Sequence, residues 1–135
     1  MLKNSDELNG MRVAGKLAAE VLEMITEYVK PGISTGELDE ICFKYITNVQ
    51  KAIPANVGYR GFEKTLCTSI NQVICHGIPD TNRILKSGDI MNIDVTVIKD
   101  GWHGDTSKMF LIGKAQSHNE RLVRVTQECL YKGIE

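Results

Sequence analysis

The stretch DIMNIDVTVIKDGWHGDTSKMF, residues 89–110, predicts a β-hairpin. Two runs of β-favouring residues flank Asp100-Gly101, a dipeptide typical of the two-residue type I′ turn, in which both central residues need positive φ. With these two residues as the loop, Lys99 pairs with Trp102, and the register of the whole hairpin follows. The register decides which side chains share a face of the sheet, and therefore what the hairpin buries or binds.

Two aspartates lie in this hairpin where apolar residues would be expected. The register places Asp94 opposite Ser107 and Asp105 opposite Thr96, so both carboxylates project from the same face. As diagonal neighbours, their Cα atoms should lie roughly 7–8 Å apart, close enough for the carboxylates to share one or two cations. His103 projects on this face as well. The opposite face carries side chains expected in the core: Ile93, Val95, Val97, Thr106 and Phe110.

Carboxylates this close repel each other and lose hydration unless a cation or hydrogen-bond donors compensate. We therefore interpret Asp94 and Asp105 as metal ligands. The alternative is a solvent-facing pair on an exposed sheet face, because ion-pair networks also place carboxylates in unusual positions. That alternative agrees poorly with the apolar residues expected on the same face, which are Ile90, Ile98, Met109 and Leu111. A bulge in either strand would shift the register.

Length and composition indicate one domain without an unusual partner. The chain has 135 residues and a formal net charge of −1, with no run of lysine and arginine that would suggest nucleic-acid binding. No apolar run reaches transmembrane length, and the first ten residues lack the hydrophobic core of a signal peptide, so we expect a cytoplasmic protein. The cysteines show no C-x-x-C pair and no disulfide-like spacing. We expect reduced thiols buried as small apolar side chains at Cys42, Cys67, Cys75 and Cys129.

Helices are predicted on both sides of the β-rich region. Apolar residues, including Leu8 and Met11, recur at helical spacing from Asn4, the expected cap, to about Val29. Ser34 and Glu37 indicate a capping box at the start of a second helix, to about residue 49. Residues 51–88 contain two β-like pieces, TLCTSIN and QVICHGI. A third helix is predicted from residue 119, after a loop that holds His118. This order of elements predicts the α+β class, with an antiparallel sheet covered by helices on one face.

Four segments carry a resemblance to a known family: MRVAGKLAAEVLEMI, VKPGISTGELDEIC, CTSINQVICHGIP and GDIMNIDVTVIKDGWHGDTSKMF. They resemble the bacterial type I methionine aminopeptidases, which are pita-bread metallopeptidases, and the similarity covers nearly all of residues 11–135. The resemblance implies a pita-bread α+β fold in which two pseudo-symmetric halves enclose two divalent metal ions. It also implies that the protein removes the N-terminal methionine from newly made proteins.

The resemblance further implies roles for individual residues. Asp94 and Asp105 match two metal ligands, the second of which bridges both ions, and the donor types suit Mn, Fe, Co or Zn. His76 matches a histidine that hydrogen-bonds the substrate near the scissile bond, and it is therefore the expected catalytic residue. The residues that match the wall of the methionine pocket, and are expected to bind substrate together with His76, are Tyr59, Phe62 and Cys67.

Two departures from the family pattern accompany the resemblance. Glu63 stands where proline is common, and Asn56 occupies a pocket-edge position that is often small or apolar. The family chain is also longer, and its remaining ligands, a histidine and two glutamates, lie in its second half. We therefore expect residues 1–113 to form the N-terminal half of the catalytic domain. Residues 114–135 would form a loop and the first helix of the second half, in a truncated chain that is not active alone.

Two alternatives to this function stay open. One is a non-catalytic half pita-bread module that binds peptides or proteins, and the other is a related metallopeptidase such as a proline-specific one. A half chain would leave the apolar residues of the aspartate face uncovered, and a second copy packed about a two-fold axis would cover them. The expected partners are the N-terminal methionine of nascent polypeptides and, transiently, the ribosome, with no nucleic-acid specificity and no membrane.

Overall fold

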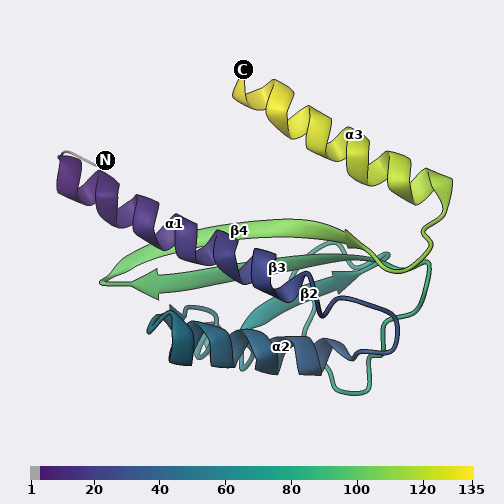
Figure 1. The fold of residues 1–135 in the computed structure, drawn as a ribbon, viewed down its shortest axis with the longest axis horizontal. Coiled ribbons are helices and arrows are strands. Elements are labelled where there is room, and N and C mark those ends of the chain that lie inside the picture. Colours follow the sequence, from purple (N-terminus) through teal and green to yellow (C-terminus); the bar gives the residue numbers. More distant parts are fainter. Residues whose placement is uncertain (1–3) are drawn as a thin grey trace.

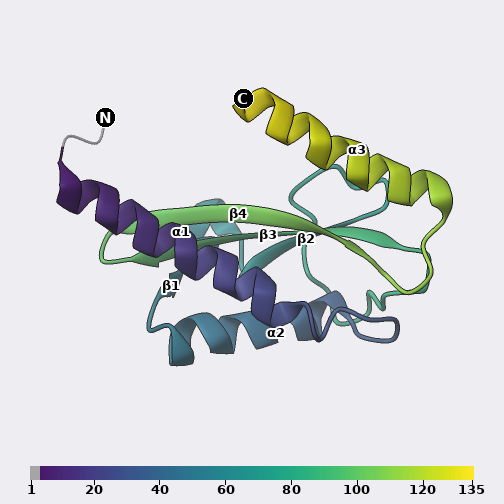
Figure 2. The same ribbon diagram turned by 45° about the horizontal axis from the view of Figure 1, so that its top comes forward.

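The structure is a computed structural model that describes residues 4–135. Two helices, α1 (Ser5–Ile25) and α2 (Thr35–Lys44), pack on one face of a four-stranded sheet (Figures 1 and 2). The strands are β1 (Ile53–Pro54), β2 (Leu66–Ile70), β3 (Ile90–Lys99) and β4 (Trp102–Leu111). A third helix, α3 (Ser117–Ile134), follows β4 and lies apart from α1 and α2. The predicted α+β class, with an antiparallel sheet and helices on one face, is confirmed.

β3 is the central strand and pairs antiparallel with all the others. β4 runs along one edge of β3 in ten consecutive pairs, from Ile90 opposite Leu111 to Lys99 opposite Trp102. The other edge is shared by β2 and the short β1, which the sequence did not predict. At the turn, φ is 50° for Asp100 and 83° for Gly101, as a two-residue turn of this type requires. The predicted hairpin and its register are confirmed.

The helix ends follow from capping. Asn4 Oδ1 accepts a hydrogen bond from the Glu7 backbone N–H at 2.9 Å, which confirms Asn4 as the cap of α1. α1 ends at Ile25 rather than near Val29, because the next residues form a turn in which the Tyr28 N–H donates to the Ile25 carbonyl. The capping box at the start of α2 is confirmed, and α2 continues into a π-helical turn, η1 (Tyr45–Val49).

The core lies between the two helices and one face of the sheet. The β3 residues predicted to be inward, Ile93, Val95 and Val97, are fully buried. α1 approaches β4 through its small residues, because a Cβ at Gly104 would lie 2.0 Å from the Ala14 carbonyl oxygen. The other core residues include Ala18, Val21, Leu22, Ile25, Leu38, Cys42, Ile46, Leu66, Leu85, Met91, Phe110 and Ile112.

Several local predictions were wrong. Leu8 and Met11 are exposed, because the nearby contact between α1 and β4 is made by Ala14 and by Gly10 against Trp102. The segment QVICHGI forms no strand, since the chain leaves β2 at Asn71 and takes left-handed backbone angles there and again at residue 76.

Two further corrections concern the ends of the hairpin region. His118 lies inside α3 and not in a loop, and α3 has no buried residue. Ile90 is 7% exposed and does not contribute to an open apolar face, while Ile98 and Met109 are half-buried. Leu111 is the member of the predicted patch that is exposed.

Within residues 4–135, no helix is both long enough and apolar enough to cross a membrane.

Candidate metal and substrate site

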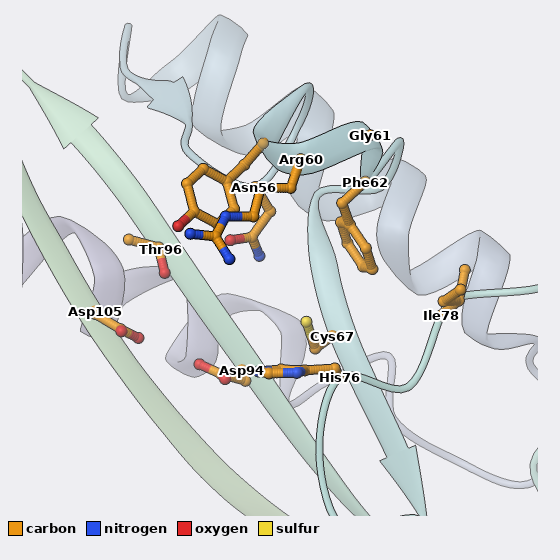
Figure 3. A pocket seen from close by; sticks show the side chains of 11 residues that line it. Asn56, Arg60, Gly61, Phe62, Cys67, His76, Ile78, Asp94, Thr96 and Asp105 are labelled. Carbon is orange, nitrogen blue, oxygen red and sulfur yellow. The ribbon is translucent and has the colours of Figure 1, made fainter.

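A pocket of about 570 Å³ opens on the face of the sheet opposite α1 and α2 (Figure 3). Eleven residues line it, and they come from β2, β3, β4 and the loops around residues 56–62 and 76–78. The structure therefore brings together the residues that the sequence singled out, although their chemical roles stay predictions. These residues are Tyr59, Phe62, Cys67, His76, Asp94 and Asp105.

The two aspartates form the polar floor of this pocket. Asp94 is half-buried on β3, and Asp105 is exposed on the neighbouring strand β4. The pKa of the Asp94 carboxyl is raised because partial burial disfavours its charged form, and further because of the charge of Asp105 and a hydrogen bond to that carboxyl. The two carboxylates repel each other when both are ionised, and a bound cation would relieve this repulsion.

His76 lies beside Asp94, and its ring is seen next to Asp94 and Cys67 in Figure 3. A charge on His76 lowers the pKa of Asp94, which partly opposes the effect of Asp105. The residue has φ of 57°, in the left-handed region that few residues other than glycine adopt. Within the described residues 4–135, its side chain makes no hydrogen bond, so both ring nitrogens are available to a ligand in the pocket.

One wall of the pocket is apolar and aromatic. Tyr59 belongs to a short 3-10 turn, η2 (Tyr59–Gly61), and Phe62 follows it directly. Cys67 is buried on β2 opposite Asp94, and burial together with the nearby aspartates and Cys75 raises the pKa of its thiol to about 11. At neutral pH this thiol is therefore protonated and acts as an apolar contact rather than as a nucleophile.

The structure adds residues that the sequence did not single out. Arg60 has φ of 49°, and its guanidinium lies 5.4 Å from the centre of the Tyr59 ring, at the edge of the pocket. Glycines at positions 58 and 61 are the sequence signal for a turn here, but they do not show which side chains the turn presents. Asn56 lines the pocket as expected, and its amide also donates to the Thr65 carbonyl at 3.1 Å. The remaining lining residues are Gly61, Ile78 and Thr96.

The cysteine prediction was half right. All four thiols are free, and Cys42 and Cys67 are buried as expected. Cys75 and Cys129 are exposed instead, because one lies in the loop beside His76 and the other on α3, which buries no side chain. The prediction failed at Cys75 and Cys129 because it treated every cysteine as a small apolar residue of the core.

The donor set fits a divalent metal ion but is incomplete in these residues. Carboxylate oxygens are hard ligands, and Asp94 and Asp105 line the same pocket from the neighbouring strands β3 and β4. Among residues 4–135, however, no group of three or more histidine, cysteine, aspartate or glutamate side chains is positioned to hold an ion. Two aspartates alone are an incomplete ligand set, because affinity depends on ligand number and preformed geometry.

Comparison with known proteins identifies the family. The model of "Metallopeptidase family M24" matches residues 9–135, nearly the whole chain. The chain belongs to metallopeptidase family M24. This agrees with a pocket that has two acidic residues on its floor, and it identifies the sheet and helices as a half of the family's pita-bread fold.

Similar proteins within this M24 family are methionine aminopeptidases. The chain is 64% identical over 133 residues to the enzyme of Escherichia coli K12, and 53% identical over 135 residues to that of Buchnera aphidicola from Acyrthosiphon pisum. These matches cover 98% and 100% of this chain but 50% and 51% of the relatives. The chain thus spans about half the length of the curated relatives that it matches.

Solved structures agree with the sequence matches. The methionine aminopeptidase of Rickettsia prowazekii superposes with a TM-score of 0.96 at 50% identity, over 100% of this chain and 54% of that one. The enzyme of Thermotoga maritima superposes with a TM-score of 0.92 at 30% identity, over 98% of this chain and 53% of that one. An Xaa-Pro dipeptidase from Bacillus anthracis, at 16% identity and a TM-score of 0.69, shares the fold alone.

Proposed function

We propose that this chain is the part of a methionine aminopeptidase that supplies two acidic metal ligands and the methionine pocket. The observation that carries the proposal is the convergence of Asp94, Asp105 and His76 in one pocket beside an apolar wall. The 64% identity to a methionine aminopeptidase supports this activity over a proline-specific one, whose structures share the fold at much lower identity.

Asp94 and Asp105 would bind two divalent metal ions. Each ion would be Co, Mn, Fe or Zn. When bound, such ions act as Lewis acids that polarise the scissile carbonyl and make a water molecule more acidic. The support from this chain is the pair of close, partly desolvated carboxylates, which a cation would stabilise. The remaining ligands would come from outside residues 4–135, among which no group of three donors is positioned to hold an ion.

The other residues of the pocket would act on the substrate. The apolar wall of Tyr59, Phe62 and Cys67 would bind the thioether side chain of methionine, which favours contacts with aromatic rings. The imidazole of His76, whose side chain makes no hydrogen bond within residues 4–135, would hydrogen-bond the substrate near the scissile peptide. Peptide hydrolysis would release free methionine and leave a new amino terminus on the peptide.

The proposal extends to the setting of the reaction. The substrates would be nascent polypeptides in the cytoplasm, with transient contact to the ribosome. Residues 1–113 would form the first half of the catalytic domain, and residues 114–135 would start the second half, which agrees with the absence of buried side chains on α3. On its own, the 135-residue chain would associate as a homodimer through the aspartate face, although the burial of Ile90 makes that face less apolar than expected.

One observation favours a second function. The two acidic ligands without a third donor among residues 4–135 would also suit a half pita-bread module that binds peptides without cleaving them. Such a module would use the apolar wall but not the aspartates. It therefore predicts peptide binding that does not depend on Asp94 or Asp105.

The test uses the protein as expressed from its own gene, loaded with Co²⁺ or Mn²⁺. It should release methionine from a Met-Ala-Ser peptide, and Asp105→Asn should abolish release by removing a charged ligand. Ser107→Ala changes a neighbour on the same strand face outside the pocket and serves as the matched control. Release that survives Asp105→Asn, or peptide binding with no release by the metal-loaded protein, would contradict the proposal.

A further inference from the structure

The position of His76 is not explained by its own contacts. The side chain is exposed and makes no hydrogen bond within residues 4–135, and its backbone adopts a left-handed conformation. Such a conformation is disfavoured for a residue with a Cβ, and it persists only when neighbouring structure imposes it. The neighbouring structure therefore has to hold this residue beside Asp94.

The loop that carries His76 is attached to the fold at its two ends. At the start, the Asn71 N–H donates to the Ile90 carbonyl and the Val73 N–H to the Ile70 carbonyl. At the end, the backbone of Asp80 is held by the Thr35 hydroxyl at 2.9 and 3.1 Å. The six residues between these anchors, 74–79, are hydrogen-bonded to the rest of the described chain at one residue, Gly77.

Gly77 is bound to β2 through both of its backbone groups. Its carbonyl accepts a hydrogen bond from the Thr68 N–H at 2.7 Å, and its N–H donates to the Ser69 hydroxyl oxygen at 3.2 Å. The approach is so close that a Cβ at Gly77 would lie 2.1 Å from the Thr68 carbonyl oxygen. Because that oxygen belongs to the backbone of a buried strand, a side chain here would push the loop away from β2.

The Ser69 hydroxyl is the side-chain half of this attachment. Ser69 is 4% exposed, in the strand that also carries Cys67 into the pocket. Within residues 4–135, the Ser69 hydroxyl makes one hydrogen bond, which it accepts from the Gly77 N–H. A valine or alanine could occupy the same strand position but could not make this bond. A polar side chain at this buried position thus serves the loop rather than the sheet.

We propose that Ser69 and Gly77 are positioning residues that fix the backbone next to His76 and thereby hold its imidazole beside Asp94. This inference rests on the proposed function only where it assigns His76 to the substrate. The positioning itself follows from the two hydrogen bonds, the missing Cβ and the conformation at residue 76. Loss of the Ser69 hydroxyl leaves the Gly77 N–H without this partner and the loop attached to β2 through the Gly77 carbonyl alone, so the backbone beside His76 can shift.

The first arm of the test is kinetic and uses the metal-loaded full-length protein. Ser69→Ala should lower kcat for a Met-Ala-Ser peptide by about tenfold, because a displacement of about 1 Å can cost up to 10²-fold in rate. KM and metal content should stay within about twofold of the wild type. In a His76→Ala background, the same change should have no further effect, since a residue that acts through His76 has nothing left to position. Additive losses in the double variant would overturn the proposal.

Ser87→Ala is the matched control, because the Ser87 hydroxyl also accepts a hydrogen bond from a backbone N–H, that of Lys114 at 3.1 Å. It removes the same kind of bond away from the pocket and should leave kcat unchanged. A loss of kcat equal to that of Ser69→Ala would show a general effect of losing such a bond and would overturn the positioning role.

The second arm needs no catalytic activity and so separates this inference from the proposed function. In protein labelled with ¹³C-histidine, the His76 ring signal, assigned by its loss in His76→Ala, should shift or broaden in Ser69→Ala and stay unchanged in Ser87→Ala. In the wild type, the Gly77 amide should exchange with solvent at least tenfold more slowly than those of residues 74–76. An unchanged His76 signal or an unprotected Gly77 amide would overturn the proposal, whether or not the wild type releases methionine.

Discussion

Asp39 ties helix α2 to strand β2 through two backbone hydrogen bonds, and its removal should destabilise the fold strongly. This carboxylate of α2 is 7% exposed, and its Oδ1 accepts hydrogen bonds from the backbone N–H groups of Thr65 at 2.8 Å and Leu66 at 2.9 Å. These bonds join α2 to the start of β2, where Leu66 directly precedes Cys67 of the pocket wall. Asp39→Ala removes both bonds and leaves two buried N–H groups without a partner.

The loss should be large and specific to the acceptor oxygen. Hydrogen bonds to charged groups are worth about 1.5–3 kcal/mol each, so Asp39→Ala should lower the free energy of unfolding by about 3–5 kcal/mol. Asp39→Asn keeps a carbonyl oxygen at the same place and removes a charge that burial disfavours, and it should stay within about 1 kcal/mol of the wild type. Urea denaturation followed by circular dichroism measures both variants.

The effect should also depend on pH in a defined direction. Burial raises the pKa of Asp39 above its ordinary value of 3.8, and this outweighs the two backbone hydrogen bonds, which lower it. Because the folded-state pKa is the higher one, the ionised side chain costs stability at neutral pH, and this cost disappears as the pH falls through that pKa to 3.8. The stability of the wild type relative to Asp39→Asn should therefore rise on acidification. An Asp39→Asn variant that is as unstable as Asp39→Ala at pH 7 would refute this reasoning.

The remaining predictions concern the pocket and the contact between α1 and the sheet. His76→Ala in the full-length protein should lower turnover of a Met-Ala peptide by roughly 10²-fold with metal content intact, whereas His103→Ala, outside the pocket, should change neither. Gly104→Ala should destabilise the fold by at least about 2–3 kcal/mol, because its Cβ would collide with the Ala14 carbonyl. Gly15→Ala, with open space around its Cβ in the middle of α1, should instead stabilise the fold by about 0.5–1 kcal/mol in thermal denaturation. The opposite order of these two glycine variants would contradict the packing of α1 on β4.

Features that depend on neighbouring residues in sequence could be predicted. The Asp100-Gly101 turn fixes the register of β3 and β4 by itself, which is why the shared face of Asp94 and Asp105 followed from the sequence alone. The caps at Asn4 and Ser34 are likewise local patterns. These local signals were enough to put both aspartates on the face that forms the floor of the pocket.

Features that depend on distant segments could not be predicted. Strand β1 consists of two residues, and its pairing with β3 spans more than forty residues of chain. The segment 72–78 has a β-favouring composition, but its path is set by the close approach of Gly77 to Thr68 and by the left-handed backbone at His76. The resemblance supplied Tyr59, Phe62 and Cys67, whereas the inward position of Arg60 depends on the backbone of its turn.

Metal stoichiometry and methionine release, measured on the same preparations of full-length protein, test most sharply whether Asp94 and Asp105 bind metal. We expect the wild type to bind divalent ions tightly and to release methionine, and Asp94→Asn to lose both. Thr96→Ala, which changes an uncharged residue lining the same pocket, should keep its metal. Undiminished metal stoichiometry and methionine release in Asp94→Asn would contradict the claim that the two aspartates of this hairpin form a metal site.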